Sequence, residues 1–377
     1  MLTKISKEQL PVSSPRPYLG CDPELFIATD KGIVGAERVI PKAGLIARGW
    51  ASNSKIVLDG VQLELHPPPC TCRQSLGAYI GRLFADFERA LKDKNGGFKA
   101  SFDPVISVSK KELDSLSDEA KVLGCAPSLN SYDPKATIKV SKRNARVRSA
   151  GGHIHIGFAS RVVKSLLKTD RVVKMVQLLD VLVGLPCVLI DRDPNQAKRR
   201  RVYGRAGEYR LPPHGIEYRV PSNFWLHHYY LMHFVTGMCR LACNVFVVSY
   251  TPSCKGFNFA DDLLSKVNIK KVVRAINRNN YDLALEQWLP VAAWIDEHVP
   301  SSVSSGLWSG LTDDFLYFAE KVHEKGLKYW FPADPLDHWV RNKTGTPGAG
   351  GFESFLVTKV QRERLHKVTS EDLPKAA

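Results

Sequence analysis

The sequence predicts an α+β fold, and three observations lead to this class. Four short strand-like pieces alternate polar with apolar side chains, so each has a charged face and an apolar face. Residues 74–93 and 169–190 carry apolar side chains at helical spacing, which predicts two helices packed over a sheet. An apolar helix from about Trp225 to Tyr250 and several shorter amphipathic helices over 259–330 follow. With 377 residues, 44% of them hydrophobic, the chain can bury a large core.

Composition divides the chain into four parts. Residues 1–17 hold three prolines among serines and are expected to form a flexible leader. The main domain is placed at 18–254, a helical annex of structural role at 255–365, and a polar tail at 366–377. Residues 344–354 within the annex form a glycine-rich loop without the Lys-Ser/Thr ending of a P-loop. A lid or plain loop is therefore favoured over a phosphate cradle.

The first strand-like piece, residues 18–27, is apolar and bounded by turn residues, so it is read as one buried strand. Alternation puts Asp22 and Glu24 on the same face. Buried carboxylates need a compensating cation or hydrogen bonds. This is the first indication of a metal site.

The second piece, residues 56–66, is read as a strand that places Gln62, Glu64 and His66 on one face, and the prolines at 67–69 end it. His66 is interpreted as a capping or packing residue. The third piece, residues 151–157, reads Gly-Gly-His-Ile-His-Ile-Gly and puts His153 and His155 on one face. Its glycines allow another backbone or a phosphate to approach closely.

The fourth piece is Gly215–Ser222, in which Glu217 and Arg219 share one face. It follows an arginine-rich run over 199–210. Arginine suits such a face because its planar fork binds two oxygens of a phosphate or carboxylate at once. Together the four pieces predict one concave sheet face that collects carboxylates, histidines and arginines.

This set of residues favours particular chemistry. Carboxylates with one or two imidazoles suit Mg²⁺ or Mn²⁺ better than a closed zinc site. Arginines beside such a metal are what phosphoryl transfer requires, because that reaction is mainly alignment and charge neutralisation.

Net charge and cysteine content bound the remaining classes. The formal charge of +15 favours a polyanionic partner, and a nucleic acid is possible, but the basic clusters at 139–148 and 198–210 lack the regular aromatic residues of a single-strand platform. The eight cysteines form no CxxC pair and read as reduced thiols. No signal peptide or uninterrupted membrane span is recognised, so a cytoplasmic location without a membrane partner is expected.

The motifs resemble a known family when taken in order. Gly-x-Asp-Pro-Glu, Gln-Leu-Glu, Gly-Gly-His-Ile-His, Tyr-Gly-x-Ala-Gly-x-Tyr-Arg and Gly-Ile-Glu-Tyr-Arg-x-Pro-Ser, from about Leu19 to Trp225, resemble the phage-encoded carboxylate–amine ligases. These ligases are a glutamine-synthetase-like group related to glutamate–cysteine ligase. The resemblance implies a curved antiparallel sheet that forms half a funnel, with packed helices.

The resemblance also implies roles for individual residues. The implied metal ligands are Glu24, Glu64, His153 and Glu217. The implied nucleotide contacts are His155, Arg201 and Arg205. The implied catalytic residues are Arg219, Arg210 and Glu217, the arginines holding the transferred phosphoryl group and the acceptor carboxylate. Related synthetases have Glu-x-Glu in the first strand, so whether Asp22 binds metal or braces the turn stays open.

The implied activity is an ATP- and Mg²⁺-dependent (or Mn²⁺-dependent) amidoligase. A carboxylate attacks the γ-phosphate of ATP to give an acyl phosphate, and a neutral amine then displaces phosphate to form an amide. The implied partners are an amino acid, peptide or protein that supplies these two groups, in the host cytoplasm if the protein is phage-encoded, and an oligomer is possible.

Two other classes stay open. A metal-dependent hydrolase built on the His-x-His strand would need more histidines on other strands. A non-catalytic nucleic-acid-binding protein would follow from the positive charge alone and is not favoured; its binding would weaken steeply with salt.

Overall fold

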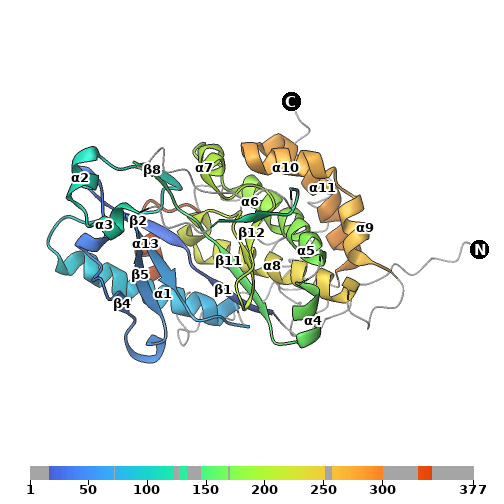
Figure 1. The fold of residues 1–377 in the computed structure, drawn as a ribbon, viewed down its shortest axis with the longest axis horizontal. Helices are drawn as coiled ribbons and strands as arrows, with labels where there is room; N and C mark the ends of the chain where they lie inside the picture. The colour runs from blue at the N-terminus through green and yellow to red at the C-terminus, as the bar shows by residue number, and fades with distance from the viewer. Residues whose placement is uncertain are drawn as a thin grey trace, which may run out of the picture.

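The structure, a computed structural model, describes residues 17–71, 73–122, 127–133, 146–168, 170–250, 257–299 and 330–341. Its strands form antiparallel sheets, and helices flank them on both sides in the view of Figure 1. The α+β class that the sequence predicts is confirmed. The predictions for residues 1–16, 344–354 and 366–377 lie outside the described residues.

The central sheet has five strands in the order β1-β11-β13-β12-β9. Their bounds are Pro17–Cys21, Ile154–Phe158, Gly215–Tyr218, Glu208–Arg210 and Leu129–Asn130 in that order. Alternation is as predicted: Ile154, Ile156, Ile216 and Tyr218 are fully buried on the apolar face. The opposite face is therefore free to carry polar groups.

A second sheet has the order β3-β2-β6-β5-β4, with β7 also paired to β2. Their bounds are Gly32–Val34, Glu24–Thr29, Gln62–His66, Lys55–Asp59, Leu45–Ile46 and Lys99–Ser101. The strands β8 (Val105–Ser107) and β10 (Val147–Ser149) form a separate pair.

The prediction of a single strand over residues 18–27 is wrong. This stretch forms two strands, β1 and β2, which belong to different sheets and are separated by Asp22 and Pro23. Proline has no N–H for a strand ladder, which explains the break. Backbone bonds join the sheets here, from Leu65 N to Pro23 O (3.0 Å) and from Glu24 N to Gly151 O (2.8 Å). The predicted single concave face is therefore the junction of two sheets.

The prediction of a single strand over residues 56–66 is also wrong. This stretch forms a hairpin of β5 and β6 in which Asp59 pairs with Gln62. Gly60 supplies a φ of +60°, which the two-residue turn requires. Glu64 nevertheless lies on the strand that pairs with β2.

The two predicted covering helices are present. The first is α1, Arg73–Asp93. The second consists of α5 (Arg171–Leu179), a π-helical segment η4 (Asp180–Gly184) and α6 (Leu185–Ile190). Asp170 is the N-cap of α5, and its side chain makes no capping hydrogen bond.

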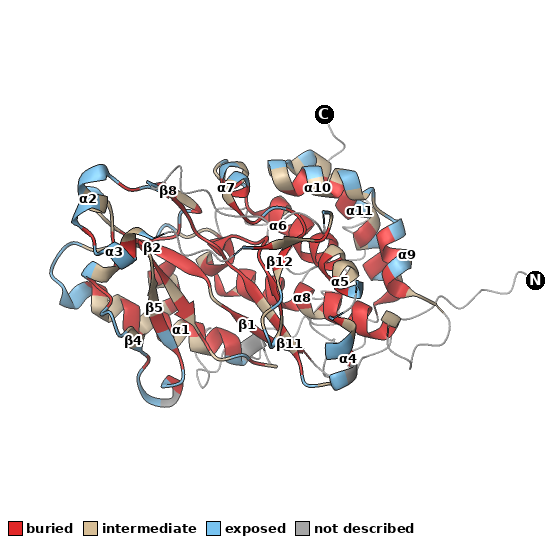
Figure 2. Cartoon of the chain, in the orientation of Figure 1, coloured by how far each residue is buried: buried red, intermediate tan, exposed pale blue. Residues whose placement is uncertain are grey.

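The helix predicted from Trp225 is α8 and begins later, at Tyr229, ending at Tyr250. A 3₁₀ segment, η5 (Asn223–His227), precedes it because the Ser222 side chain caps that turn by accepting from Phe224 N. Helix α8 packs against α1, α5, α9 (Phe259–Ser265) and β1 and is buried along most of its length (Figure 2).

Two helical segments are long and apolar enough to cross a membrane, Arg171–Ile190 and Tyr229–Tyr250. In the most apolar window of each, 78% and 94% of the residues are buried inside the protein. Burial in the core accounts for their composition.

The described part of the annex contains α9 (Phe259–Ser265), α10 (Ile269–Arg278), α11 (Tyr281–His298) and α13 (Pro335–Arg341). Helix α11 packs on α6, and α13 packs on α1. Their buried residues join the same hydrophobic cluster as β1 and α8. The other short helices among the described residues are α2 (Lys110–Ser115), α3 (Asp118–Lys121), α4 (Arg161–Leu166), α7 (Gln196–Val202), η1 (Ala36–Arg38) and η2 (Gly49–Ala51).

Candidate active site

A row of polar side chains crosses the central sheet. His155 on β11 lies directly opposite Glu217 on β13, and Glu217 lies directly opposite Arg210 on β12. Side chains at directly opposite positions of neighbouring antiparallel strands share a face and lie close together. The strand register therefore brings together three residues that are far apart in the sequence.

Glu217 is held by two arginines. Arg210 donates to both of its carboxylate oxygens, from Nε at 2.6 Å and from Nη2 at 2.5 Å, and Arg219 Nε lies 3.2 Å from Oε1. Only 3% of the Glu217 side chain and 2% of the Arg219 side chain are exposed, whereas 29% of the Arg210 side chain is exposed. Arg219 also donates to Ser128 Oγ. Arg210 is thus the member of this set that a bound anion can reach.

The second sheet brings its own pair of carboxylates to the junction. Glu24 on β2 lies directly opposite Glu64 on β6. Glu24 Oε2 accepts from Gly151 N at 2.6 Å and from the Tyr203 hydroxyl at 2.8 Å. Glu64 Oε2 lies 2.7 Å from His66 Nε2. His66 therefore contacts a candidate site residue, a role that the sequence interpretation did not give it.

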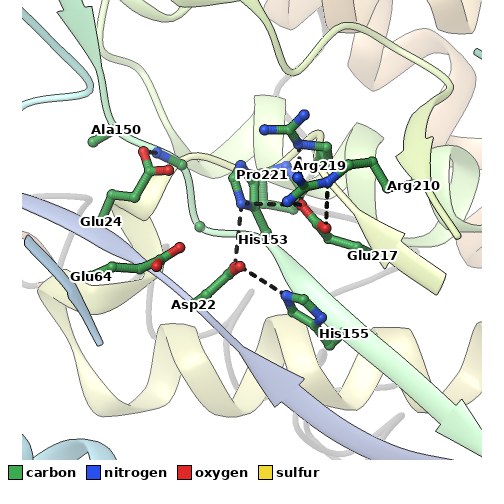
Figure 3. A network of polar contacts seen from close by, with 12 residues as sticks. Asp22, Glu24, Glu64, Ala150, His153, His155, Arg210, Glu217, Arg219 and Pro221 are labelled. Atoms are coloured by element: carbon green, nitrogen blue, oxygen red, sulfur yellow. Dashed lines mark hydrogen bonds and ion pairs between the residues drawn. The ribbon is translucent and has the colours of Figure 1, made fainter. Parts of the chain in front are cut away.

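Asp22 lies between the two sets. One of its oxygens is 2.9 Å from His155 Nε2, and the other is 3.3 Å from His153 Nδ1. His153 Nδ1 is also 3.6 Å from Glu217 Oε1. Figure 3 shows Asp22 between the two imidazole rings, with Glu64 and Glu24 beside it. The residue whose role stayed open in the sequence is central in the structure.

The cluster fits a divalent cation. Asp22, His155 and Glu217 each offer a ligand atom, and these atoms lie within 4.8 Å of one another. His153 Nε2 is buried without a hydrogen-bond partner, and Asp22 Oδ1 and His153 Nδ1 are buried 3.3 Å apart without a well-formed hydrogen bond. Buried polar atoms are normally satisfied, so these atoms indicate a missing ligand. A set of carboxylates and imidazoles suits Mg²⁺ or Mn²⁺.

The pKa shifts of Glu24, Glu64 and Asp22 reflect the burial of several carboxylates close together. Burial raises the pKa of Glu24 to about 7. Burial, and then the charges of Asp22 and Asp59, raise the pKa of Glu64 to about 9. Burial pushes the pKa of Asp22 upward as well, but His153 and His155 outweigh it and hold that pKa well below its ordinary value. A cation bound here would neutralise part of this charge and lower the raised pKa values.

The two glycines before His153 allow close packing of backbone rather than of a phosphate. A Cβ on Gly152 would overlap the carbonyl oxygen of Ser222 and the indole of Trp225. A Cβ on Gly151 would overlap the ring of His153. The Gly-Gly pair thus lets the segment that carries His153 lie directly against residues 222–225.

Arg199, which is completely buried, ties this segment to the end of β13. Its guanidinium donates to the carbonyl oxygens of Ala150 (2.9 Å), Arg219 (3.2 Å), Val220 (2.9 Å) and Pro221 (2.9 Å). One side chain therefore fixes the spacing of His153 and Arg219. The sequence showed an arginine run here but gave no indication of which member points inward.

Two predicted nucleotide contacts do not join the cluster. Arg201 lies at the exposed end of α7. Arg205 donates from Nε to the carbonyl of Arg200 and from Nη2 to that of Arg201, both at 3.0 Å, and so caps α7. Their contact with a nucleotide stays a prediction. His214, 2.9 Å from His155 across the ring nitrogens, is a neighbour that the sequence interpretation missed.

Comparison with known proteins bears on this cluster. A family model, phage phiEco32-like COOH.NH2 ligase-type 2, matches residues 141–246. This segment contains His153, His155, Arg210, Glu217 and Arg219, whereas Asp22, Glu24 and Glu64 lie outside it. No protein of curated function matches the sequence.

Among solved structures, a bifunctional glutathione synthetase from Pasteurella multocida is similar at 11% identity. The alignment covers 88% of this chain and 52% of that one, so this chain spans about half of its length. The TM-score is 0.36, which is too low to indicate a common fold.

The resemblance that the sequence motifs predicted is thus confirmed over residues 141–246, where this chain matches the phage phiEco32-like COOH.NH2 ligases of type 2.

Proposed function

We propose that this protein is an ATP-dependent carboxylate–amine ligase that activates a carboxylate as an acyl phosphate and joins it to an amine. The observation that carries the proposal is the cluster of Asp22, His153, His155 and Glu217 with two arginines. Most of it lies inside the segment that matches a ligase family. The joined sheets would correspond to the half-funnel of the glutamine-synthetase-like enzymes.

In this proposal Asp22, His155 and Glu217 hold a divalent cation, with Glu24, Glu64 and His153 as further candidate ligands. The cation would neutralise phosphate charge during transfer. Arg210 donates one hydrogen bond to each oxygen of Glu217, and each oxygen keeps a further lone pair, so Glu217 could bind a cation while Arg210 stays in contact with it. The exposed part of the Arg210 guanidinium would then bind the anionic substrate or the transferred phosphoryl group.

The other residues orient this set. Arg219 contacts Glu217 from the buried side, and Arg199 binds the backbone carbonyls of Ala150 and Arg219, which lie before β11 and after β13. The junction is lined on one side by β2 and β6 and on the other by β11 and β13, so substrates held there are aligned by two rigid sheets. Alignment of reactants is the main contribution that a protein makes to phosphoryl transfer.

The test is an assay with ATP, Mg²⁺ and a pool of amino acids and small carboxylic acids, with hydroxylamine as the trapping amine. An acyl phosphate then appears as a hydroxamate, accompanied by ADP. We expect Glu217→Gln to lower hydroxamate formation by roughly 100-fold or more, because it removes the negative charge with which Arg210 and Arg219 pair. Glu119→Gln is the matched control, because the Glu119 side chain is 70% exposed and pairs with Lys42 outside the cluster.

If the protein does not bind ATP and yields neither ADP nor hydroxamate, the proposal is wrong. If it binds ATP but yields no product, a peptide or protein acceptor is added to the pool before the assay is repeated.

A further inference from the structure

A pocket lies outside the cluster of the candidate active site. Its volume is about 490 Å³, which is within the range of small-molecule sites. Its walls come from the loop after β7, from the α6–α7 connection, from η5 and from the residues before α13. None of the cluster residues Asp22, Glu24, Glu64, His153, His155, Arg210, Glu217 or Arg219 lines it.

One wall of this pocket is aromatic. Phe102, His227 and Phe331 form a continuous set of rings, with centroids 5.3 Å apart for the first pair and 5.0 Å apart for the second. Phe224 adds a further ring. The electron-rich faces of such rings attract cations as well as apolar groups.

Three carboxylates also line the pocket: Asp103, Asp191 and Asp193. Within the described part of the chain, none of them forms an ion pair with a lysine, arginine or histidine. The lining also includes Arg192, but its guanidinium lies over the ring of Tyr281, 3.3 Å from the centroid, and its Nε donates to Leu189 O. The three acids outnumber the one arginine in the pocket lining, which therefore carries an excess of negative charge.

These acids do not form a metal site. In the described residues, the group of acids and histidines whose ligand atoms lie within 4.8 Å of one another is the one at Asp22, His155 and Glu217. Asp103, Asp191 and Asp193 are not such a group. A ligand that pairs with these carboxylates and also packs against the three rings must be larger than a single metal ion.

We propose that this pocket binds an organic cation, a protonated primary amine carried on an apolar or aromatic body. The ammonium group would pair with Asp103 and Asp193, and the body would lie against Phe102, His227 and Phe331. Gln196 fixes the third acid, because its Nε2 donates to Asp191 Oδ2 and to Ser222 Oγ at 2.8 Å. The site is thus preorganised on its buried side.

The pocket is in contact with the backbone of the candidate active site. Asn223, in its lining, donates from Nδ2 to the carbonyl of Glu24 at 3.0 Å. Pro104, also in its lining, accepts from Ala150 N at 2.9 Å, next to the Gly151 N–H that binds the Glu24 carboxylate. An occupant of the pocket is therefore placed to act as the amine substrate or as an effector of the cluster.

Calorimetric titration of the intact protein with 2-phenylethylamine tests the proposal, with 2-phenylethanol as a neutral ligand of the same shape. We expect the amine to bind several-fold more tightly than the alcohol, and its binding to weaken as NaCl is raised. Asp193→Asn and Asp103→Asn should each weaken amine binding by roughly three- to tenfold and leave alcohol binding unchanged. Asp103 is exposed and Asp193 is half-buried, so both variants are expected to fold.

The matched control is Asp114→Asn, an exposed acid on α2 that is not part of the pocket lining. Equal affinity for amine and alcohol, or amine binding that neither pocket variant weakens, would overturn the proposal. The titration contains no ATP, so its outcome is independent of the ligase proposal. Adding ATP, Mg²⁺ and the carboxylate pool then separates the two sources: the amine is consumed if it is a substrate and stays intact if it is an effector.

Discussion

At the scale of single residues, Asp22 changes the interpretation of the site most. Its carboxylate contacts both histidines of the His-x-His segment. Asp22 also belongs to the candidate metal site with His155 and Glu217, and it directly follows β1. The sequence left its role open because it stands one residue before a proline, where a turn-bracing role is equally reasonable. Contact with His153 and His155 favours a ligand role.

Asp22→Asn should therefore weaken binding of Mn²⁺. The change keeps the size of the side chain but removes the negative charge that a hard cation needs, and we expect affinity to fall by roughly 10- to 100-fold. Mn²⁺ affinity is measured by electron paramagnetic resonance of the free ion. Asp30→Asn is the control, since the Asp30 side chain is 87% exposed and pairs with Lys99. Unchanged Mn²⁺ affinity in Asp22→Asn would remove this residue from the metal site.

At the scale of elements, the segment from Ala150 to His153 connects the two sheets. Gly151 binds both the Glu24 carboxylate and, through its carbonyl, Glu24 N, while the Gly152 carbonyl accepts from the Trp225 indole at 3.1 Å. These bonds require the backbone of residues 151–152 to lie against β2 and residues 221–225. Glycine is needed because a side chain would occupy that contact.

Gly152→Ala should destabilise the protein by roughly 1–3 kcal/mol, because the added methyl group meets the Ser222 backbone, which cannot move independently of β13. Urea denaturation measures the change. Gly81→Ala, inside α1, is the matched control: the nearest atom to its Cβ is Cε3 of Trp339 on α13, at 3.7 Å, which is an ordinary contact. There alanine should stabilise by up to about 1 kcal/mol through helix propensity. Equal effects of the two changes would contradict the packing argument.

At the scale of the whole molecule, Asp180 links the helices to the central sheet. It lies in the π-helical segment η4 and accepts from the Tyr218 hydroxyl of β13 at 2.7 Å. It is fully buried, and burial raises its pKa from 3.8 to about 7. The folded protein thus holds a proton here that the unfolded chain releases at lower pH.

This difference predicts a pH dependence of stability. The neutral Asp180 contributes stability that is complete below its unfolded pKa and is lost as the pH rises through about 7. Asp180→Asn keeps an oxygen for Tyr218 and removes the charge. Relative to the unchanged protein, we expect the variant to gain roughly 2–4 kcal/mol of unfolding free energy between about pH 4 and about pH 8. Urea denaturation at several pH values checks this.

Asp296→Asn on α11 is the control for that series, because Asp296 is exposed and its replacement should shift the unfolding free energy equally at both ends of the range. A constant difference between Asp180→Asn and the unchanged protein would show that Asp180 does not titrate on folding.

The sequence alone determined which residues are polar among apolar neighbours. Period-two alternation identified Glu24, Glu64, His155, Glu217 and Arg219, and period-3.6 spacing identified α1 and the α5–α6 helix, because both patterns depend only on local backbone geometry. The order of motifs identified the ligase resemblance over residues 141–246.

Tertiary structure decided which of these residues meet. The break at Asp22–Pro23 and the hairpin at Gly60 turned one expected sheet into two, and their junction brought Asp22 to both histidines. Tertiary contacts also bury Arg199, whereas Arg201 and Arg205 stay at the end of α7. Neighbouring arginines look alike in a sequence, because the difference between a buried clamp and an exposed side chain arises only from the carbonyl groups that distant segments supply.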